Sequence, residues 1–325
     1  MNSAAGNVLQ TLGGMALLYF GAEWLVRGGA GLAQRLGISP LIVGLTIVAY
    51  GTSTPEVIVG IQAGWSGHGD LALGNVIGSN IANLGLILGL TALLRPAPVH
   101  RALPRCEVPV LLLTTLALVW MLQDGRLSSW ESYALLATSG LYSLWMILRT
   151  RRDQETEVHL EATADAAERV GAPRGGPIPR LVALILVGLL LLILGGQMLV
   201  FGASRLAQAM GISERLVGLT IVAVGTSIPE LATSLVAAWR GHTDMAVGNV
   251  VGSNIFNVLL CLGAAGLGGR LTSVPTLRNP DLGALVLMTL TGVLLLRTER
   301  TIRRWEGGAL LGLYFLYLGI AVARG

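Results

Sequence analysis

Two halves of this 325-residue chain carry the same sequence at a constant offset of 174 residues. Residues 44–89 match residues 218–263 at 28 of 46 aligned positions. The segment GLTIVAYGTSTPE returns as GLTIVAVGTSIPE, and GHGDLALGNVIGSNIAN returns as GHTDMAVGNVVGSNIFN. This duplication constrains the fold strongly, because one molecule must hold two closely related structures side by side.

The composition indicates that both copies lie in a membrane. Hydrophobic residues make up 53% of the chain and charged residues only 12%, about half of the charged fraction of soluble domains. Apolar segments long enough to cross a bilayer recur from end to end. We therefore expect an all-α membrane protein with ten transmembrane helices and the lipid bilayer as its solvent. The expected spans lie near residues 8–35, 39–65, 70–94, 107–123, 128–149, 179–210, 213–239, 244–268, 280–297 and 306–323.

The hydrophilic stretch between the two sets of spans divides the chain. We expect a first transmembrane repeat over residues 1–149, a cytoplasmic linker over 150–178 and a second repeat over 179–325. Five spans per repeat is an odd number, so the second repeat enters the membrane inverted relative to the first. Inverted repeats whose matched segments meet at mid-depth are common in secondary transporters.

The arginine distribution predicts the orientation. All 22 basic residues are Arg, and ten spans with both termini outside would place 16 of them on the cytoplasmic side. The positive-inside rule favours this topology in the cytoplasmic membrane. The six on the outside would be Arg126, Arg205, Arg215, Arg270, Arg278 and Arg324.

Several functional classes receive no support from the sequence. The arginines form no basic stripe with interleaved aromatic residues, so we expect no nucleic-acid partner. Cys106 and Cys261 lack the spacing of a zinc site or a disulfide framework. The stretch before the first apolar run has no basic region or cleavage site, so we expect a permanent span there. The sequence leaves the oligomeric state open and implies no cofactor.

Two acidic residues, Glu56 and Glu230, lie inside apolar spans at equivalent positions. An ionisable group at that depth is costly and usually needs a partner or a wet cavity. No Arg lies nearby in either span, so the partner we expect is a transported cation. Pro55 and Pro229 precede them, and because proline interrupts the helical hydrogen-bond ladder, each span should break there.

The surrounding residues offer neutral oxygen ligands. A broken helix frees carbonyls, which we expect around Ala49, Thr52, Ala223 and Thr226, and such backbone is tolerated at membrane depth only beside a cavity or within protein. Hydroxyls and amides follow at helical spacing, where residues four apart share one face. An all-oxygen set favours Ca²⁺ and Na⁺ over zinc or copper. The side chains concerned are those of Thr52, Ser53, Thr226, Ser227, Ser79, Asn83, Ser253 and Asn257.

The paired G-T-S-x-P-E and G-N-x-x-G-S-N-x-x-N segments resemble the alpha repeats of the calcium/cation antiporter superfamily, best known from sodium/calcium exchangers. The resemblance implies ten helices, and alternating access by sliding of the first and sixth helices against the rest. It also implies transported Ca²⁺ and Na⁺. The cation ligands that it implies are Ala49, Thr52, Ser53, Glu56, Ser79, Asn83, Ala223, Thr226, Ser227, Glu230 and Ser253.

One position departs from that pattern. Sodium/calcium exchangers of this superfamily carry an acidic residue where this chain has Asn257. The site would then hold two carboxylates and two equivalent amides, from Asn83 and Asn257. A charge of −2 is balanced by one Ca²⁺ or by two monovalent ions, so stoichiometry and electrogenicity stay open. Buried carboxylates can also carry protons, so H⁺/Ca²⁺ exchange is the alternative within the transporter class.

Other interpretations are weaker. The serine and asparagine side chains could serve helix packing alone, and an intramembrane hydrolase using Ser53 or Ser227 would lack an evident base. A channel could use the same oxygens, although broken helices in inverted repeats favour alternating access. We expect Asp70 and Asp244 to be helix N-caps, with His68 and His242 beside them. No D-x-D-x-D-G loop marks the linker as a calcium-binding element.

Overall fold

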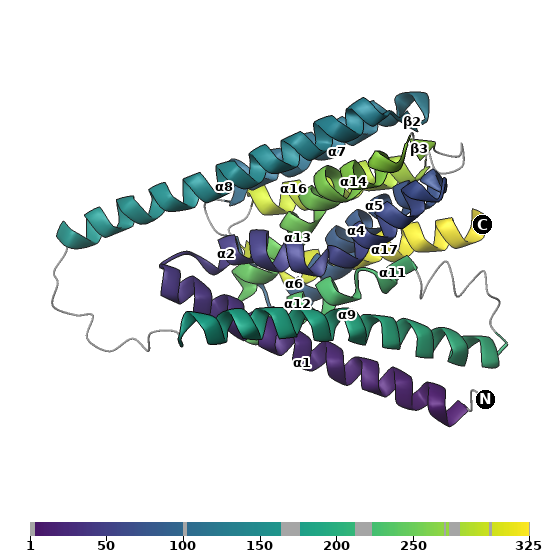
Figure 1. Ribbon diagram of the computed structural model, residues 1–325, viewed down its shortest axis with the longest axis horizontal. Coiled ribbons are helices and arrows are strands. Elements are labelled where there is room, and N and C mark those ends of the chain that lie inside the picture. The colour runs from purple at the N-terminus through teal and green to yellow at the C-terminus, as the bar shows by residue number, and fades with distance from the viewer. Residues whose placement is uncertain are drawn as a thin grey trace.

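The computed structural model describes residues 4–99, 103–163, 176–211, 223–269, 271–272, 280–298 and 301–324. Long helices lie side by side along one axis of the molecule (Figure 1). The start of α1 and the end of α17 lie at one end, which we call the terminal end. The end of α8 and the start of α9 lie at the opposite end, the linker end.

The first half begins with the long helix α1 and continues through short helices, several of which join end to end. Its π-helical turns are labelled η1, η2 and η3, and η4 is a 3₁₀ turn. The elements are α1 (Ala4–Leu36), α2 (Pro40–Val43), η1 (Gly44–Val48), α3 (Ala49–Thr52), α4 (Thr54–Trp65), α5 (Gly69–Ala82), η2 (Asn83–Ile87), α6 (Leu88–Leu94), β1 (Ala97–Pro98), η3 (Leu103–Glu107), α7 (Val108–Met121), η4 (Leu122–Asp124), β2 (Arg126–Leu127) and α8 (Ser129–Thr163).

The second half repeats this order within the described residues. Its π-helical turn η6 follows α13 as η2 follows α5. The elements are α9 (Ile178–Ala209), α11 (Ala223–Gly225), α12 (Ile228–Trp239), α13 (Thr243–Phe256), η6 (Asn257–Leu262), α14 (Gly263–Ala265), η7 (Gly266–Gly268), β3 (Leu271–Thr272), α16 (Pro280–Thr298), β4 (Thr301–Ile302) and α17 (Arg304–Arg324).

The helices are long and apolar enough for a membrane protein. In the described part of the chain, six continuous helices could cross a bilayer by length and composition, or seven if one bent pair is a single span. The bent pair is Pro40–Thr52 with Thr54–Trp65. The expected all-helical membrane class is therefore confirmed. The count of ten spans also needs α1, α8 and a span over 213–239, whose first residues are outside the described part.

The two repeats are related by the offset seen in the sequence. Strand β1 pairs with β4, and β2 pairs with β3, both antiparallel. Strands β1 and β3 are 174 residues apart, and β2 and β4 are 175 apart, so each strand pair is the counterpart of the other. Thr115 and Thr289 are 174 residues apart, and their hydroxyl oxygens approach to 3.4 Å. These contacts are the ones that a pseudo-two-fold axis between inverted repeats would produce.

Helices α1 and α9 form a closely packed antiparallel pair along one side of the molecule (Figure 1). Glycines seven residues apart let the two backbones approach. A Cβ atom built on Gly21 would lie 2.8 Å from the Gly188 carbonyl oxygen, and one on Gly195 would lie 2.9 Å from the Gly14 oxygen. Side chains at these positions would force the helices apart, so glycine is required there.

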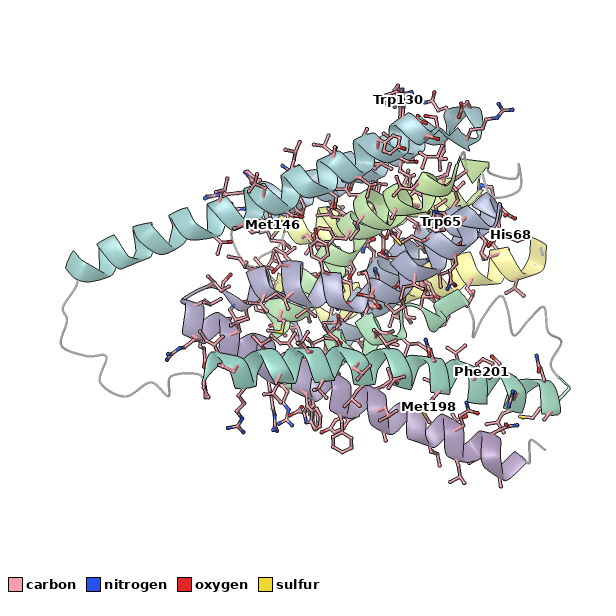
Figure 2. The ribbon with its side chains drawn as sticks, viewed as in Figure 1. Trp65, His68, Trp130, Met146, Met198 and Phe201 are labelled. Atoms are coloured by element: carbon pink, nitrogen blue, oxygen red, sulfur yellow. The ribbon has the colours of Figure 1, made fainter. Side chains whose placement is uncertain are left out.

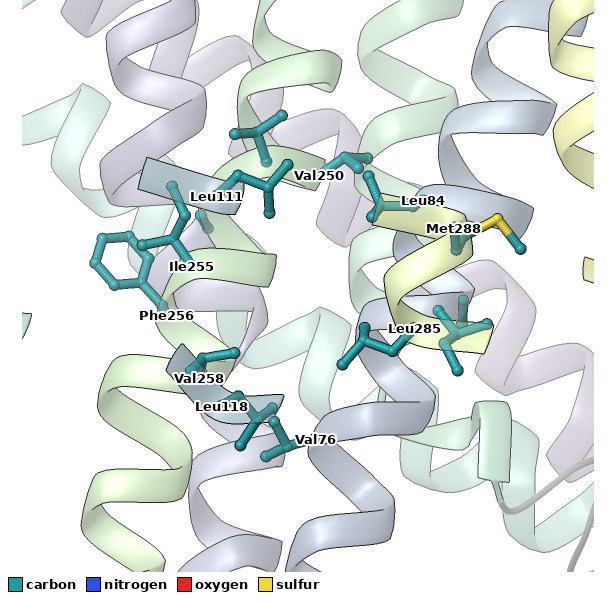
Figure 3. Close-up of a cluster of buried hydrophobic side chains, with 14 of the residues drawn as sticks. Val76, Leu84, Leu111, Leu118, Val250, Ile255, Phe256, Val258, Leu285 and Met288 are labelled. Carbon is teal, nitrogen blue, oxygen red and sulfur yellow. The ribbon is translucent and has the colours of Figure 1, made fainter. Parts of the chain in front are cut away.

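The core lies between this pair and the outer helices α7 and α8. Valine, leucine and isoleucine side chains of α5, α7, α13 and α16 interdigitate there with Phe256 and Met288 (Figure 3). Large apolar side chains on the outside, such as Leu141 and Leu190, are exposed and suit contact with lipid. Exposed tryptophans mark the helix ends: Trp65 and Trp130 at the terminal end (Figure 2) and Trp305 at the start of α17.

The expected N-cap role of Asp70 and Asp244 needs correction. Helix α5 begins at Gly69, directly after the left-handed Gly67, so His68 occupies the N-cap and Asp70 lies inside the first turn. Asp244 lies in the same place in α13, after His242. Both carboxylates still face the positive end of a helix dipole. Helix α8 continues to Thr163, so the first part of the expected linker is helical. Among the arginines used for topology, several lie outside the described residues: Arg101, Arg169, Arg174, Arg215, Arg270, Arg278 and Arg300.

Candidate cation site

Both predicted helix breaks are present. Helix α3 ends at Thr52, Ser53 has φ −81° and ψ 5°, and α4 resumes at Thr54 with Pro55 as its second residue. The two parts of this span are bent by 43°. In the second repeat Ser227 has nearly the same backbone, φ −86° and ψ 5°. The proline in the first turn of each new helix cannot donate to the preceding turn, which accounts for the break.

The two glutamates follow these breaks and are fully buried. Serine hydroxyls cross between the repeats to reach them. The Ser227 Oγ donates to Glu56 Oε1 at 3.2 Å, and the Ser53 Oγ donates to Glu230 Oε1 at 2.9 Å. The Oε2 atoms of both glutamates have no hydrogen-bond partner in the described protein. Burying a carboxylate oxygen without a partner is unfavourable, so both positions are suited to a cation.

The serine and asparagine side chains of the following helices add buried oxygens without partners. The Ser79 and Ser253 hydroxyls and the Asn83 amide find none in the described protein, and Asn257 donates to Asn80 Oδ1 while its own Oδ1 remains unpaired. π-helical turns start at the two asparagines, in η2 and η6. Such turns widen the helix and recur at functional sites.

The backbone carbonyls differ from expectation. The Ala49 carbonyl accepts a hydrogen bond from the Ser53 N–H at 3.1 Å, so the break does not free it, and one lone pair remains for an ion. In the second repeat the Ser227 N–H bonds to Val224 at 3.1 Å instead. Ala223 lies at the start of α11. The repeat is thus asymmetric at the carbonyl that precedes each break.

The structure adds two asparagines that the sequence reasoning missed. The Thr52 hydroxyl donates to Asn249 Oδ1 at 3.1 Å, and the Thr226 hydroxyl donates to Asn75 Oδ1 at 3.2 Å. Asn249 also donates to the Ser234 Oγ at 3.0 Å. Both asparagines belong to the duplicated G-N-x-x-G-S-N segment, so their repetition was the signal that could have found them.

Asn249 therefore orients the Thr52 hydroxyl, and its loss should weaken ion binding. We expect Asn249→Ala to raise the substrate concentration for half-maximal transport by about tenfold, the equivalent of one lost buried hydrogen bond of ~1.4 kcal/mol. Asn75→Ala is the comparison variant: it removes the equivalent bond from the Thr226 hydroxyl, but its effect should be smaller, because Asn75 is half-buried and its Nδ2 has no partner in the described protein, whereas Asn249 is buried and also held by Ser234. Equal effects of the two substitutions on ion-dependent uptake would contradict this.

The two halves of the site differ in accessibility. Thr52 and Asn249, toward the linker end, are buried, whereas their counterparts Thr226 and Asn75, toward the terminal end, are half-buried. Close contact of η1 with α13 seals the linker side: a Cβ on Gly252 would lie 2.7 Å from the Leu45 oxygen. Within the described residues, the site is therefore closed on its linker side.

The charge of the site comes from the glutamates alone. In the described part of the chain, no three His, Cys, Asp or Glu side chains cluster so that they could hold a metal ion. Glu56 and Glu230 lie within range of each other's charge. An ion held here would thus rely on two carboxylates and neutral oxygens, a donor set that suits hard cations.

Comparison with known proteins identifies the family of the chain. The sodium/calcium exchanger protein family matches residues 7–148 and 180–323, one match for each repeat. The chain belongs to the sodium/calcium exchanger family. The solved structure of the sodium–calcium exchanger NCX_Mj soaked with 2.5 mM Na⁺ and 0.1 mM Ca²⁺ superposes with a TM-score of 0.81 at 32% identity, covering 96% of this chain and 97% of that one.

Curated relatives agree with this family membership. The chain is 39% identical to CaxA of Alkalimonas amylolytica, over 77% of each sequence. It is 38% identical to the inner membrane protein YrbG of Escherichia coli K12, over 78% of this chain and 77% of that one. The sodium/calcium exchanger MaX1 of Methanosarcina acetivorans is 30% identical over 96% of this chain and 97% of its own length. As a member of the sodium/calcium exchanger family, the protein is a multi-pass cation exchanger and not an enzyme.

Proposed function

We propose that this exchanger moves Ca²⁺ against Na⁺ by alternating access through the site between the two repeats. The observation that carries the proposal is the pair of fully buried glutamates, each bonded to a serine of the other repeat through one oxygen and unpaired at the other. Twelve residues form the proposed ligand set: Ala49, Thr52, Ser53, Glu56, Ser79, Asn83, Ala223, Thr226, Ser227, Glu230, Ser253 and Asn257.

The charge of the site supports competition between the two ions. Two carboxylates give −2, which one Ca²⁺ or two Na⁺ would neutralise. An empty site would carry its charge through the membrane interior at high cost, because ionised groups are expensive there. Only a site that holds an ion would then switch its access readily from one side of the membrane to the other. This coupling makes the protein an exchanger, because an empty site cannot return without a counter-ion. Asn257 is neutral at a position where an acid would add a third negative charge. The site therefore carries at most two negative charges.

The membrane location and the orientation of the protein are inferred from its arginine distribution and from the name of one relative. We infer that the protein lies in the cytoplasmic membrane, as the name of the relative YrbG states for that protein. The linker end, where the arginine-rich residues 149–152 lie, would face the cytoplasm, and the terminal end would face outside. The conformation described here would then be closed toward the cytoplasm.

The coupling ion is tested by ⁴⁵Ca²⁺ uptake into proteoliposomes under an outward Na⁺ gradient and, separately, an outward H⁺ gradient. Uptake driven by Na⁺ alone is expected, because the neutral oxygens beside the carboxylates are ligands for Na⁺ but not for a proton. Uptake driven only by H⁺ would make the two glutamates proton carriers and establish H⁺/Ca²⁺ exchange. Flux at channel-like rates without a counter-ion gradient would overturn exchange altogether.

A further inference from the structure

A buried acid outside the cation site forms an ion-pair cluster toward the linker end. Glu23, in α1, has a side chain that is only 5% exposed. The Arg240 guanidinium forms a bidentate ion pair with this carboxylate, which we call the fork. Its Nη2 lies 2.6 Å from Oε1, and its Nε donates to Oε2 at 2.8 Å. Arg27 Nε lies 2.5 Å from Oε1 of the same carboxylate. We call these three residues the Glu23 cluster.

The two ion pairs of the cluster differ in what they connect. Arg27 lies one turn from Glu23 on α1, so that pair stays within one helix. Arg240 follows the last residue of α12 and leads into α13, so the fork joins α1 to the body that carries Glu230. A ring contact continues the junction, with Tyr19 of α1 and Trp239 of α12 6.4 Å apart between centroids. Bidentate arginine–carboxylate pairs are strong and geometrically specific.

The described residues at the equivalent positions toward the terminal end form no such ion pair. The repeat makes three positions there equivalent to the Glu23 cluster, and all are exposed and uncharged: Gln197, Phe201 and Ser66. Ile193 stands at the position equivalent to Tyr19, so the ring contact of Trp239 has no equivalent at Trp65. Both repeats thus contribute to the cation site, but the ion pair that joins α1 to α12 at the linker end has no equivalent between α9 and α4.

We propose that the Glu23 cluster is a latch that closes the linker end of the exchanger. This inference rests on the proposed alternating access, in which the α1–α9 pair moves against the rest of the protein. Any such movement must separate Glu23 from Arg240, whereas Glu23 and Arg27 move together. Breaking the fork would leave this buried carboxylate with Arg27 as its remaining partner in the cluster, so the fork stabilises the conformation that is closed at the linker end over the one that is open there.

Hydrogen–deuterium exchange of the full chain in lipid nanodiscs tests the latch without depending on which ion is transported. In Glu23→Gln and Arg240→Gln, backbone amides of α2, η1 and the first turns of α13 should exchange at least about threefold faster than in wild type. Amides near Trp65, at the terminal end, should not become faster. Arg240→Lys, which keeps the charge but loses the fork, should give an intermediate rate.

Arg27→Gln is the matched control, because it removes one arginine from the same carboxylate without cutting the junction between α1 and α12. Wild-type exchange at the linker end in this variant, beside faster exchange in Arg240→Gln, would support the latch. Equal rates in Arg27→Gln and Arg240→Gln would overturn it, and so would acceleration spread evenly over the whole chain, which signals general destabilisation. Uptake assays report separately on the proposed ion exchange, so failure of one proposal is distinguishable from failure of the other.

Discussion

Replacing Glu56 or Glu230 by glutamine should abolish ion-coupled Ca²⁺ uptake while the protein still folds. Each glutamate contributes half of the site's negative charge, and its Oε2 is an unpaired buried oxygen. Removing one partner of a buried charge pair costs about 3–5 kcal/mol, which is more than about a hundredfold in binding. We therefore expect uptake in proteoliposomes to fall to background for either variant, even under an outward gradient of the coupling ion.

Folding should survive because glutamine has nearly the same shape as glutamate. Its side-chain oxygen can still accept from the Ser227 or Ser53 hydroxyl, and the ion-free variant no longer buries a charge. The thermal unfolding midpoint without Ca²⁺ should accordingly equal or exceed that of the wild type. Addition of Ca²⁺ should raise the midpoint of the wild type but not of either variant, since a ligand that binds only the folded state stabilises it.

Glu131→Gln is the matched control for this pair. Glu131 caps the start of α8, where it accepts hydrogen bonds from the Ser128 N–H and hydroxyl at 2.7 Å, and glutamine is also accepted at that position of a helix. Its uptake should match the wild type. Normal uptake by Glu56→Gln or Glu230→Gln would remove that glutamate from the ion site.

The duplicated motif predicted two buried glutamates that follow helix breaks, and the structure has them at these positions. Glu56 and Glu230 stand out because an acid inside an apolar span is rare, and the proline before each one predicts a break in the helix by a local mechanism. The structure contains both breaks. The family follows from the paired motif segments and the all-helical membrane class from the apolar composition of each span, which is why sequence reasoning reached both.

The contacts between the two repeats could not be predicted from the sequence. The bond from Thr52 to Asn249 joins residues 197 positions apart, and it exists only because the repeats are inverted and interleaved. The Ala49 carbonyl was expected to be free, but α3 stays helical through Thr52, so the Ser53 N–H still bonds to it. Glu23 was missed because it has no repeat, and its partner Arg240 is distant in sequence.

The packing of α1 on α9 is a second feature whose loss should have a large effect. A Cβ on Gly188 would lie 2.7 Å from the Leu25 nitrogen and 2.8 Å from the Gly21 oxygen, both backbone atoms that cannot rotate away. Overpacking of this kind costs about 1–3 kcal/mol. Helix α9 also covers both helix breaks, with Leu189 against Gly51 and Val200 against Gly225, so a displaced α9 should disturb the cation site.

We expect Gly188→Ala to lower the thermal unfolding midpoint by several degrees and to reduce Ca²⁺ uptake by at least about tenfold, since a small displacement at a packed interface is enough to misplace ligands. Gly312→Ala is the control: Gly312 lies in α17 with nothing within 4 Å of a built Cβ, so alanine should be neutral or stabilising by up to about 1 kcal/mol. A normal midpoint and normal uptake in Gly188→Ala would mean that α1 and α9 are not held at this distance in the membrane.

The double variant separates loss of this one contact from general weakening of the pair. A Cβ on Gly21 would strike the Gly188 oxygen at 2.8 Å, and a Cβ on Gly188 would strike the Gly21 oxygen at the same distance, so both substitutions push on one crossing point. Once the first alanine has moved the helices apart, the second meets less resistance. The fall in the unfolding midpoint for Gly21→Ala with Gly188→Ala should therefore be smaller than the two single falls added together, because neighbouring sites are not additive. Strictly additive falls would show that α1 and α9 yield independently at each glycine and do not behave as one rigid pair.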